Sequence, residues 1–251
     1  MIQSNGKIVK ERISVPEGYE RVKTESNSFS EYLQTFPLKP HGKEVYYFDG
    51  RKKLGNYHVA VLDIDVGKKD LQQCADAVMR LRAEYLFKYK KFSQIHFNFT
   101  NGFNAEYAKW KEGWRVAIKG NQTSWIKNAK PDESYQSFRK YMDLVFSYAG
   151  TLSLSKELKP VELGKAQIGD VFIQGGSPGH AVLIVDMAIH SKTGEKICLV
   201  VQSYMPAQDI HILRNPNDDE LSPWIKIPEN QLEAEFITPQ WDFVRKDLKR
   251  F

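Results

Sequence analysis

The longest apolar runs of the chain lie in its last third. Residues 180–188 (HAVLIVDMA) and 197–202 (ICLVVQ) are apolar at consecutive positions, a pattern typical of strands that are covered on both faces. Shorter apolar runs flank them at 170–174 (DVFIQ) and 210–214 (IHILR). We therefore predict a sheet whose two middle strands are 180–188 and 197–202, with helices over it.

Helical periodicity dominates the middle of the chain. Residues 67–92 predict its strongest helix, with Asp70 as the N-cap and apolar residues at helical spacing, namely Leu71, Ala75, Val78, Leu81 and Tyr85. Residues 132–158 predict a second long helix. Strands are expected at 58–66, and at 94–103 where the strand ends at Asn101–Gly102.

The first part of the chain is rich in turns. Within it, residues 26–36 predict a short helix with a serine cap, and residues 44–52 predict a hairpin that turns at Asp49–Gly50. Helices come first and strands later, which favours an α+β fold over a doubly wound one.

We find no linker composition anywhere in the chain. We therefore expect a single α+β domain over residues 1–251, with an N-terminal elaboration at 1–57, a helix-rich part at 58–160 and a β-rich part at 161–251.

Composition narrows the class of protein. The chain has 251 residues, 41% hydrophobic and 27% charged, which is ordinary for a globular protein and argues against disorder. Its net charge of +5 is spread thinly, so we expect no nucleic-acid partner. No apolar run reaches the roughly 18–20 residues of a membrane span. The first residues carry no apolar signal-peptide region, so we expect no signal peptide within this chain.

Two cysteines, Cys74 and Cys198, allow at most one disulfide, and neither has the spacing of a metal site. Cys198 lies in an apolar run, where a thiol behaves as a small buried side chain. We expect no metal and no organic cofactor.

Three residues form a candidate catalytic set. Cys74 falls in the first turn of the predicted helix, where free N–H groups and the helix dipole favour a thiolate and can hold an oxyanion. His180 opens a strand after the glycine-rich loop 175–179, where it could act as base and then as acid. Gln202 ends the next predicted strand and could fix the imidazole tautomer.

The pairing of these two strands decides the role of Gln202. A three-residue loop at 192–194, with Gly194 left-handed, pairs Ser191 with Glu195 and puts Gln202 opposite Ile184, on the face of His180. A slip of one residue would send Gln202 to the other face, and the sequence leaves this register open.

Residues 169–188 resemble the histidine-bearing half of the bacterial papain-like (NlpC-type) cell-wall peptidases and amidases. The resemblance lies in the run GDVFI, the loop of small residues after it, the pair GH and the aliphatic strand that follows. In that superfamily a cysteine opens a helix, a histidine follows at the start of a strand, and a polar residue on the next strand orients the imidazole. Cys74, His180 and Gln202 match this order. The resemblance implies a papain-like core that hydrolyses a peptide or amide bond, with peptidoglycan-like peptide as the expected substrate.

The chain as a whole resembles an uncharacterised bacterial envelope protein family, the domain of unknown function 4846, whose members are mostly exported or lipid-anchored. This resemblance implies a place in the cell envelope or periplasm, with the cytoplasm left open, and it implies no activity or oligomeric state.

Four further residues are candidates for substrate binding. Ser177 and Gly179 precede the histidine in a loop that lets a substrate approach the backbone, and Gln73 is of the residue type that papain relatives place in the oxyanion hole. Trp110, with Trp114 and Trp125, could form a platform on which a sugar ring stacks.

Each candidate also has a structural interpretation. Cys74 lies on the apolar face of its helix and could be a buried thiol, His180 could bond a loop carbonyl, and the tryptophans could belong to the core. Asp186 is expected to be a buried, hydrogen-bonded carboxylate. The alternative function is therefore a non-catalytic envelope protein that binds glycan or peptide in a papain-like cleft.

Overall fold

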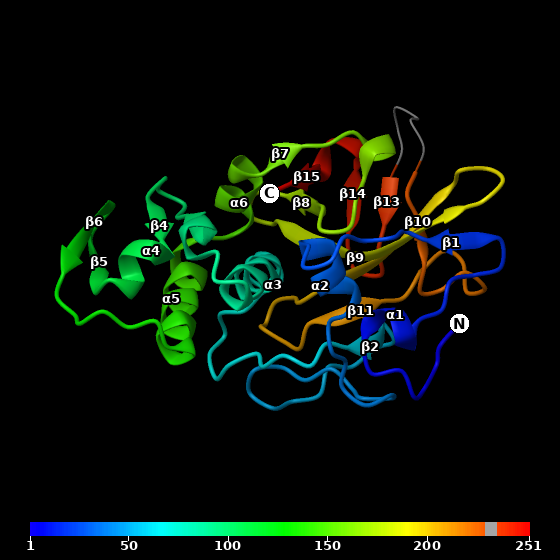
Figure 1. The fold of residues 1–251 in the computed structure, drawn as a ribbon, viewed down its shortest axis with the longest axis horizontal. Coiled ribbons are helices and arrows are strands. Elements are labelled where there is room, and N and C mark those ends of the chain that lie inside the picture. The colour runs from blue at the N-terminus through cyan, green and yellow to red at the C-terminus, as the bar shows by residue number, and fades with distance from the viewer. Residues whose placement is uncertain (229–234) are drawn as a thin grey trace.

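The computed structural model describes residues 1–228 and 235–251 (Figure 1). Its α-helices are α1 (Val9–Arg12), α2 (Phe29–Gln34), α3 (Cys74–Lys88), α4 (Tyr107–Lys111), α5 (Tyr135–Tyr148) and α6 (Thr151–Glu157). Its strands are β1 (Tyr19–Arg21), β2 (His58–Val61), β3 (His96–Asn98), β4 (Asn104–Glu106), β5 (Trp114–Lys119), β6 (Gln122–Lys127), β7 (Lys159–Pro160), β8 (Val171–Gln174), β9 (His180–His190), β10 (Lys196–Gln202), β11 (His211–Leu213), β12 (Ile225–Lys226), β13 (Glu235–Ile237), β14 (Asp242–Val244) and β15 (Leu248–Arg250).

An antiparallel sheet organises the molecule. Within the described residues it has nine strands, of which seven run in the order β2-β11-β10-β9-β8-β15-β7, while β1 pairs with β9 and β12 pairs with β10. The predicted strands at 170–174, 180–188, 197–202 and 210–214 are all present. The fold is therefore a mixed α/β fold with antiparallel sheets.

The two long apolar runs form the centre of this sheet, as predicted. Every residue of β9 from His180 to Ala188 is buried, and Cys198 of β10 is fully buried. The helix α3 packs against β9 and lies beside the sheet in Figure 1. Consecutive apolar residues are thus explained by strands that have protein on both faces.

A β-bulge decides which face Gln202 occupies. Next to the turn, Lys196 pairs with Ile189, one residue away from the predicted register. Between the pairs Leu199–Asp186 and Val200–Ile184, β9 has one extra residue, Val185. Val201 then pairs with Leu183, so Gln202 lies opposite Val182 rather than Ile184. The register that a three-residue loop would give is therefore off by one residue next to the turn, and the bulge returns Gln202 to the face of His180.

The helix α3 begins later than predicted. Its N-cap is Gln73, whose backbone is extended, and Cys74 is the first helical residue. The Asp76 carboxylate accepts a hydrogen bond from the Gln73 N–H at 3.0 Å, which is the N3-to-cap half of a capping box. The predicted cap Asp70 was wrong, because its carboxylate instead accepts from the Ala207 N–H at 2.7 Å.

The predicted second long helix is two helices. Gly150 interrupts it with an extended backbone between α5 and α6, and glycine is a poor helix former. The Gly150 N–H donates to Ser153 Oγ, so a side chain in the first turn of α6 satisfies the backbone donor at the break. This corner, together with the loop before β9, forms part of the pocket described below.

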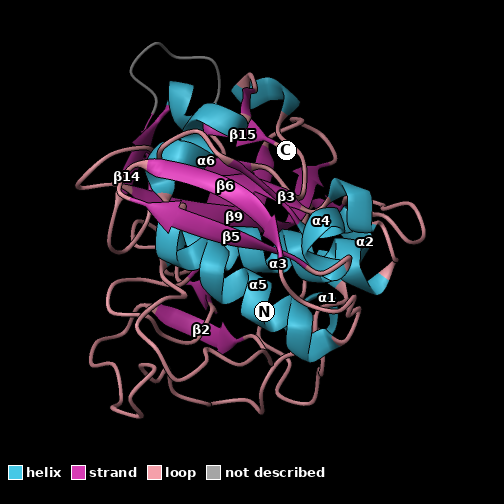
Figure 2. Cartoon of the chain, turned by 90° about the vertical axis from the view of Figure 1, so that its left-hand side faces the viewer, coloured by secondary structure: helices cyan, strands magenta, loops and turns pink. Residues whose placement is uncertain are grey.

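Smaller elements fall near their predicted places. Ser28 caps α2 by accepting from the Glu31 N–H, and Tyr46 bridges to Lys52 around the turn at Asp49–Gly50. The hairpin β5–β6 lies far from β1, at the opposite end of the molecule in Figure 1, and faces the viewer in Figure 2. No helix in residues 1–228 and 235–251 has the length and apolarity needed to cross a membrane.

The N-terminal segment is tied to the sheet by a buried carboxylate. Asp186 of β9 is fully buried, and it accepts hydrogen bonds from Arg21 Nε at 2.9 Å and Gln34 Nε2 at 2.7 Å. Arg21 belongs to β1 and Gln34 to α2, so one side chain holds two N-terminal elements. The expectation of a buried, hydrogen-bonded carboxylate at Asp186 is confirmed.

We predict that Arg21→Ala lowers the free energy of unfolding by about 3 kcal/mol, because it leaves a buried carboxylate without its cation. Lys165→Ala, which removes an exposed ion pair with Glu162, should cost no more than about 1 kcal/mol. Urea unfolding of both variants checks this. Equal losses in the two variants would contradict the role given to Asp186.

Candidate functional site

One pocket collects most of the predicted site residues. It has a volume of about 320 Å³ and is bordered by the start of α3, the corner between α5 and α6, and the loop before β9. Cys74, Gln73, Ser177 and Gly179 all line it. Residues separated by about a hundred positions in the chain therefore meet at one opening.

Cys74 contacts the backbone on either side of His180. Its Sγ lies 4.0 Å from the Gly179 carbonyl oxygen, and the Ala181 N–H is close enough to favour its thiolate. The side chain is 8% exposed. Burial raises the pKa of the Cys74 thiol to about 11, and the nearby Asp76 carboxylate acts in the same direction. In this state the cysteine is a protonated thiol.

The loop before His180 has no room for a side chain at Gly179. A Cβ there would lie 2.5 Å from Thr151 Oγ1 and 2.7 Å from the Gly176 carbonyl oxygen. Thr151 opens α6 and donates a hydrogen bond from its hydroxyl to the same carbonyl at 3.2 Å. The loop is thereby held against the corner at Gly150, and the pocket keeps its shape.

Gln202 holds the imidazole of His180. The Nε2 atom of His180 lies 2.8 Å from Gln202 Oε1, and both side chains are buried. The hydroxyl of the next residue, Ser203, lies 2.9 Å from the Gln72 carbonyl oxygen and 2.9 Å from that of Gln208, and it bridges the two. Because Gln72 lies two residues before Cys74, the end of β10 fixes both the histidine and the start of α3.

A buried lysine sets the direction of these hydrogen bonds. Lys53 Nζ donates to Gln240 Oε1 at 2.7 Å, and Gln202 Nε2 donates to the same oxygen at 2.8 Å. The other side of the Gln202 amide is therefore its oxygen, which accepts from His180 Nε2. This arrangement places the imidazole proton on Nε2 and leaves the lone pair on Nδ1.

His211 agrees with the same assignment. Its Nδ1 lies 2.8 Å from the Asp209 carbonyl, an acceptor, so Nδ1 carries the proton. Its Nε2 is then an acceptor, and it lies 3.4 Å from Gln202 Nε2. Burial lowers the pKa of His211 to about 3, so this ring stays neutral.

Burial also keeps His180 neutral. The pKa of His180 is lowered to about 4, chiefly by burial; the Gln202 hydrogen bond opposes this shift, and the positive charge of Lys53 adds to it. Burial lowers the pKa of Lys53 itself to about 8. The site therefore holds a neutral imidazole beside a buried amine.

Aromatic rings cover the histidine. The Tyr204 ring centroid lies 4.8 Å from that of His180, and the Trp241 centroid lies 5.5 Å away. Burial raises the pKa of Tyr204, and a thiolate at Cys74 would raise it too, so this tyrosine neighbours both members of the candidate pair. Trp241 is held in turn by its indole N–H, which donates to Gln174 Oε1.

Trp110 does not belong to this site. It is buried in the helix-rich part, where its indole N–H donates to the Ser137 carbonyl, and it is absent from the pocket lining. Trp114 and Trp125 lie on the projecting hairpin β5–β6. The sugar-stacking platform proposed from sequence proximity is therefore not assembled at the pocket.

Sequence reasoning missed Lys53, Gln240, Trp241 and His211. Lys53 and Gln240 lie in loops 187 residues apart, and nothing in their local patterns indicates burial beside His180. Tyr204 had a weak signal, because it follows Gln202 in the run QSY that resembles papain relatives.

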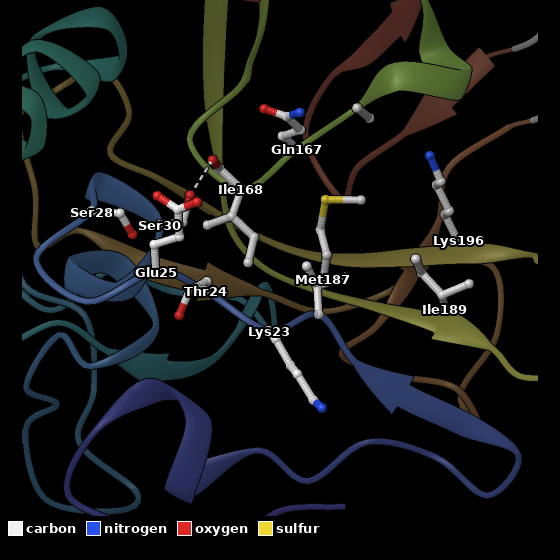
Figure 3. Close-up of a pocket in the computed structure, with 12 residues that line it drawn as sticks. Lys23, Thr24, Glu25, Ser28, Ser30, Gln167, Ile168, Met187, Ile189 and Lys196 are labelled. Carbon is white, nitrogen blue, oxygen red and sulfur yellow. Dashed lines mark hydrogen bonds between the residues drawn. The ribbon is translucent and has the colours of Figure 1, made fainter.

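Another pocket, of about 360 Å³, lies between residues 22–30, residues 166–168 and the strands β9 and β10 (Figure 3). Met187 and Ile168 form part of its wall, and the Ser30 hydroxyl donates to the Ile168 carbonyl at 3.1 Å. None of its described lining residues is a histidine or cysteine. Across the described residues, no group of three His, Cys, Asp or Glu side chains is arranged to hold a metal ion.

Comparison with known proteins identifies the family of the chain. No curated protein and no solved structure is significantly similar to the chain. The family described as a domain of unknown function (4846) matches residues 9–250, which is nearly the whole length. The chain therefore belongs to the family of the domain of unknown function 4846.

Proposed function

We propose that this protein is a thiol-dependent hydrolase of peptide or amide bonds, with a papain-like (NlpC-type) core. Cys74 is the nucleophile, His180 the general base and acid, and Gln202 the residue that orients the imidazole. We propose cell-wall peptide as its substrate and the cell envelope or periplasm as its location, on the resemblance of the histidine-bearing segment.

The observation that carries this proposal is the hydrogen bond from His180 Nε2 to Gln202 Oε1. It leaves Nδ1 with its lone pair on a ring whose neighbouring residues, Gly179 and Ala181, contact Cys74. A nucleophile, a base and a group that orients the base are the arrangement that nucleophilic catalysis requires.

The reaction starts from a neutral thiol and a neutral imidazole. His180 Nδ1 takes the Cys74 proton as Sγ attacks the substrate carbonyl, and N–H groups at the start of α3 stabilise the oxyanion. The imidazolium then protonates the leaving amine as the C–N bond breaks. Water, deprotonated by Nδ1, attacks the thioester, and Cys74 recovers its proton.

We predict that the protein releases new amino termini from peptidoglycan fragments, and that Cys74→Ala abolishes this release because the nucleophile is gone. Cys198→Ala is the matched control, since that buried thiol lies in the centre of the sheet. Mass spectrometry of the products measures both. Equal release by wild type and Cys74→Ala would rule out the hydrolase.

His180 should determine the reactivity of Cys74. In a Cys198→Ala background, His180→Ala should slow alkylation of Cys74 by iodoacetamide about 100-fold or more, the low end of what a positioned base contributes. His96→Ala, which removes a half-exposed histidine paired with Glu157, should leave the rate unchanged. An equal rate in both variants would refute the base role.

Lys53 should set the base strength of His180. Its positive charge disfavours the imidazolium, so Lys53→Met should raise the pKa of His180 and move the acid limb of the alkylation profile to higher pH. Lys52→Met, next to it but exposed, is the control. A profile that does not move, or moves to lower pH, would contradict this electrostatic coupling.

A second candidate is a non-catalytic protein that binds peptide or glycan in the same pocket. It is favoured by the burial that raises the pKa of Cys74 to about 11 and lowers that of His180 to about 4, since both shifts oppose a preformed thiolate–imidazolium pair. Cys74 labelled only after denaturation would support this candidate over the hydrolase.

A further inference from the structure

The pocket beside Cys74 has a carboxylate oxygen with no hydrogen-bond partner among the described residues. This oxygen bears on which substrate the proposed hydrolase would accept. We infer that the pocket recognises a positively charged amino group of the substrate, and that Asp76 Oδ1 is its acceptor. The inference rests on Cys74 as the reacting group but not on hydrolysis itself.

Asp76 uses only one of its two oxygens. Oδ2 accepts from the Gln73 N–H at 3.0 Å, while Oδ1 is buried and has no hydrogen-bond partner among the described residues. The residue is 6% exposed and lines the pocket. Buried carboxylate oxygens are normally paired, so an unpaired one at a pocket wall indicates that the pocket supplies the donor.

The charge of the pocket points to a cation. Its described lining includes two carboxylates, Asp70 and Asp76, and contains no lysine, arginine or histidine. The chain as a whole has a net charge of +5, so this negative pocket is a local exception. Asp70 is exposed, and its Oδ1 accepts from the Ala207 N–H and from Gln73 Nε2, so solvent can complete its hydrogen bonds. Asp76 Oδ1 is buried and has no such source.

An ammonium group satisfies this site better than a neutral amide would. An amide N–H offers a hydrogen bond but leaves the buried negative charge uncompensated, whereas an ammonium group supplies both the bond and the opposite charge. The volume of about 320 Å³ exceeds that of a water site, and apolar neighbours such as Phe146 and Leu152 can contact the carbon atoms that carry the amine.

Binding such a group would also act on the nucleophile. Burial raises the pKa of the Asp76 carboxyl well above its usual range, and its charge helps to raise the pKa of the Cys74 thiol. An ammonium group beside Asp76 offsets that charge. A substrate with an amino group near its scissile bond therefore makes Cys74 easier to ionise than a substrate without one.

Three methanethiosulfonate reagents of different charge test this recognition. In the Cys198→Ala background, 2-aminoethyl methanethiosulfonate should modify Cys74 about tenfold faster than the neutral methyl reagent, after division by their rates with free thiol, and the anionic 2-sulfonatoethyl reagent should be slowest. Asp76→Asn should remove the cationic preference. Asp143→Asn, a carboxylate outside the pocket, should keep it.

The outcomes separate this inference from the proposed hydrolase. An unchanged cationic preference in Asp76→Asn overturns the ammonium site, as does a wild-type protein that reacts equally with cation and anion. The wild-type comparison holds even where Asp76→Asn destabilises the start of α3. If His180→Ala leaves the neutral reagent's rate unchanged while the cationic preference persists, the hydrolase fails and the ammonium site stands.

Discussion

The hydrogen bonds around His180 take their direction from a buried amine and a buried imidazole, Lys53 and His211. An ammonium group can only donate, so the Gln240 atom that faces Lys53 Nζ must be its amide oxygen. That oxygen accepts from Gln202 Nε2, which turns the Gln202 oxygen toward His180. The Gln202 oxygen can only accept, so the imidazole proton lies on Nε2. His211 Nε2 is a second acceptor for Gln202 Nε2, and it holds this amide in the same direction. The lone pair on Nδ1 therefore depends on Lys53 of the N-terminal segment and on His211 of the sheet together.

The same segment is fastened to the sheet elsewhere. Arg21 and Gln34 bind the buried Asp186, so the turn-rich beginning of the chain is part of the structure that holds the histidine. The end of β10 has a similar double role, since Gln202 holds His180 and Ser203 holds the backbone before Cys74. Residues that hold the sheet together therefore also position the candidate catalytic residues.

Local patterns predicted the strands and the main helices, because apolar runs and helical spacing depend on near neighbours in the chain. They predicted Cys74, His180 and Gln202 as candidates for the same reason, since each stands at an element boundary. The predicted start of the helix was wrong because the Asp70 carboxylate accepts from the Ala207 N–H, a partner 137 residues away in the chain. The prediction of one long helix over residues 132–158 was wrong because Gly150 interrupts it, although a glycine within a helical pattern is often tolerated.

The register of β9 and β10 could not be derived from the turn alone, because an irregularity inside a strand leaves no signal in a hydrophobic run. Lys53 and Gln240 are a similar case. They are ordinary loop residues until the fold buries one against the other, and only then does their chemistry bear on His180. Local sequence patterns can therefore indicate candidate residues such as His180, but they cannot indicate the distant residues that hold them in place.

The extra residue at Val185 has a consequence for the whole family of the domain of unknown function 4846. Because one extra residue shifts the parity of a strand, Val185 leaves His180 and Gln202 on one face only when it is accommodated as a bulge. A relative that lacks this residue would need no bulge, because the regular ladder would still bring Gln202 opposite Val182, on the face of His180. A chain that keeps the residue but pairs without a bulge would bring Gln202 opposite Leu183, on the other side of the sheet. The extra residue and the bulge thus belong together, and a hairpin that has both or neither keeps the histidine and the glutamine on one face.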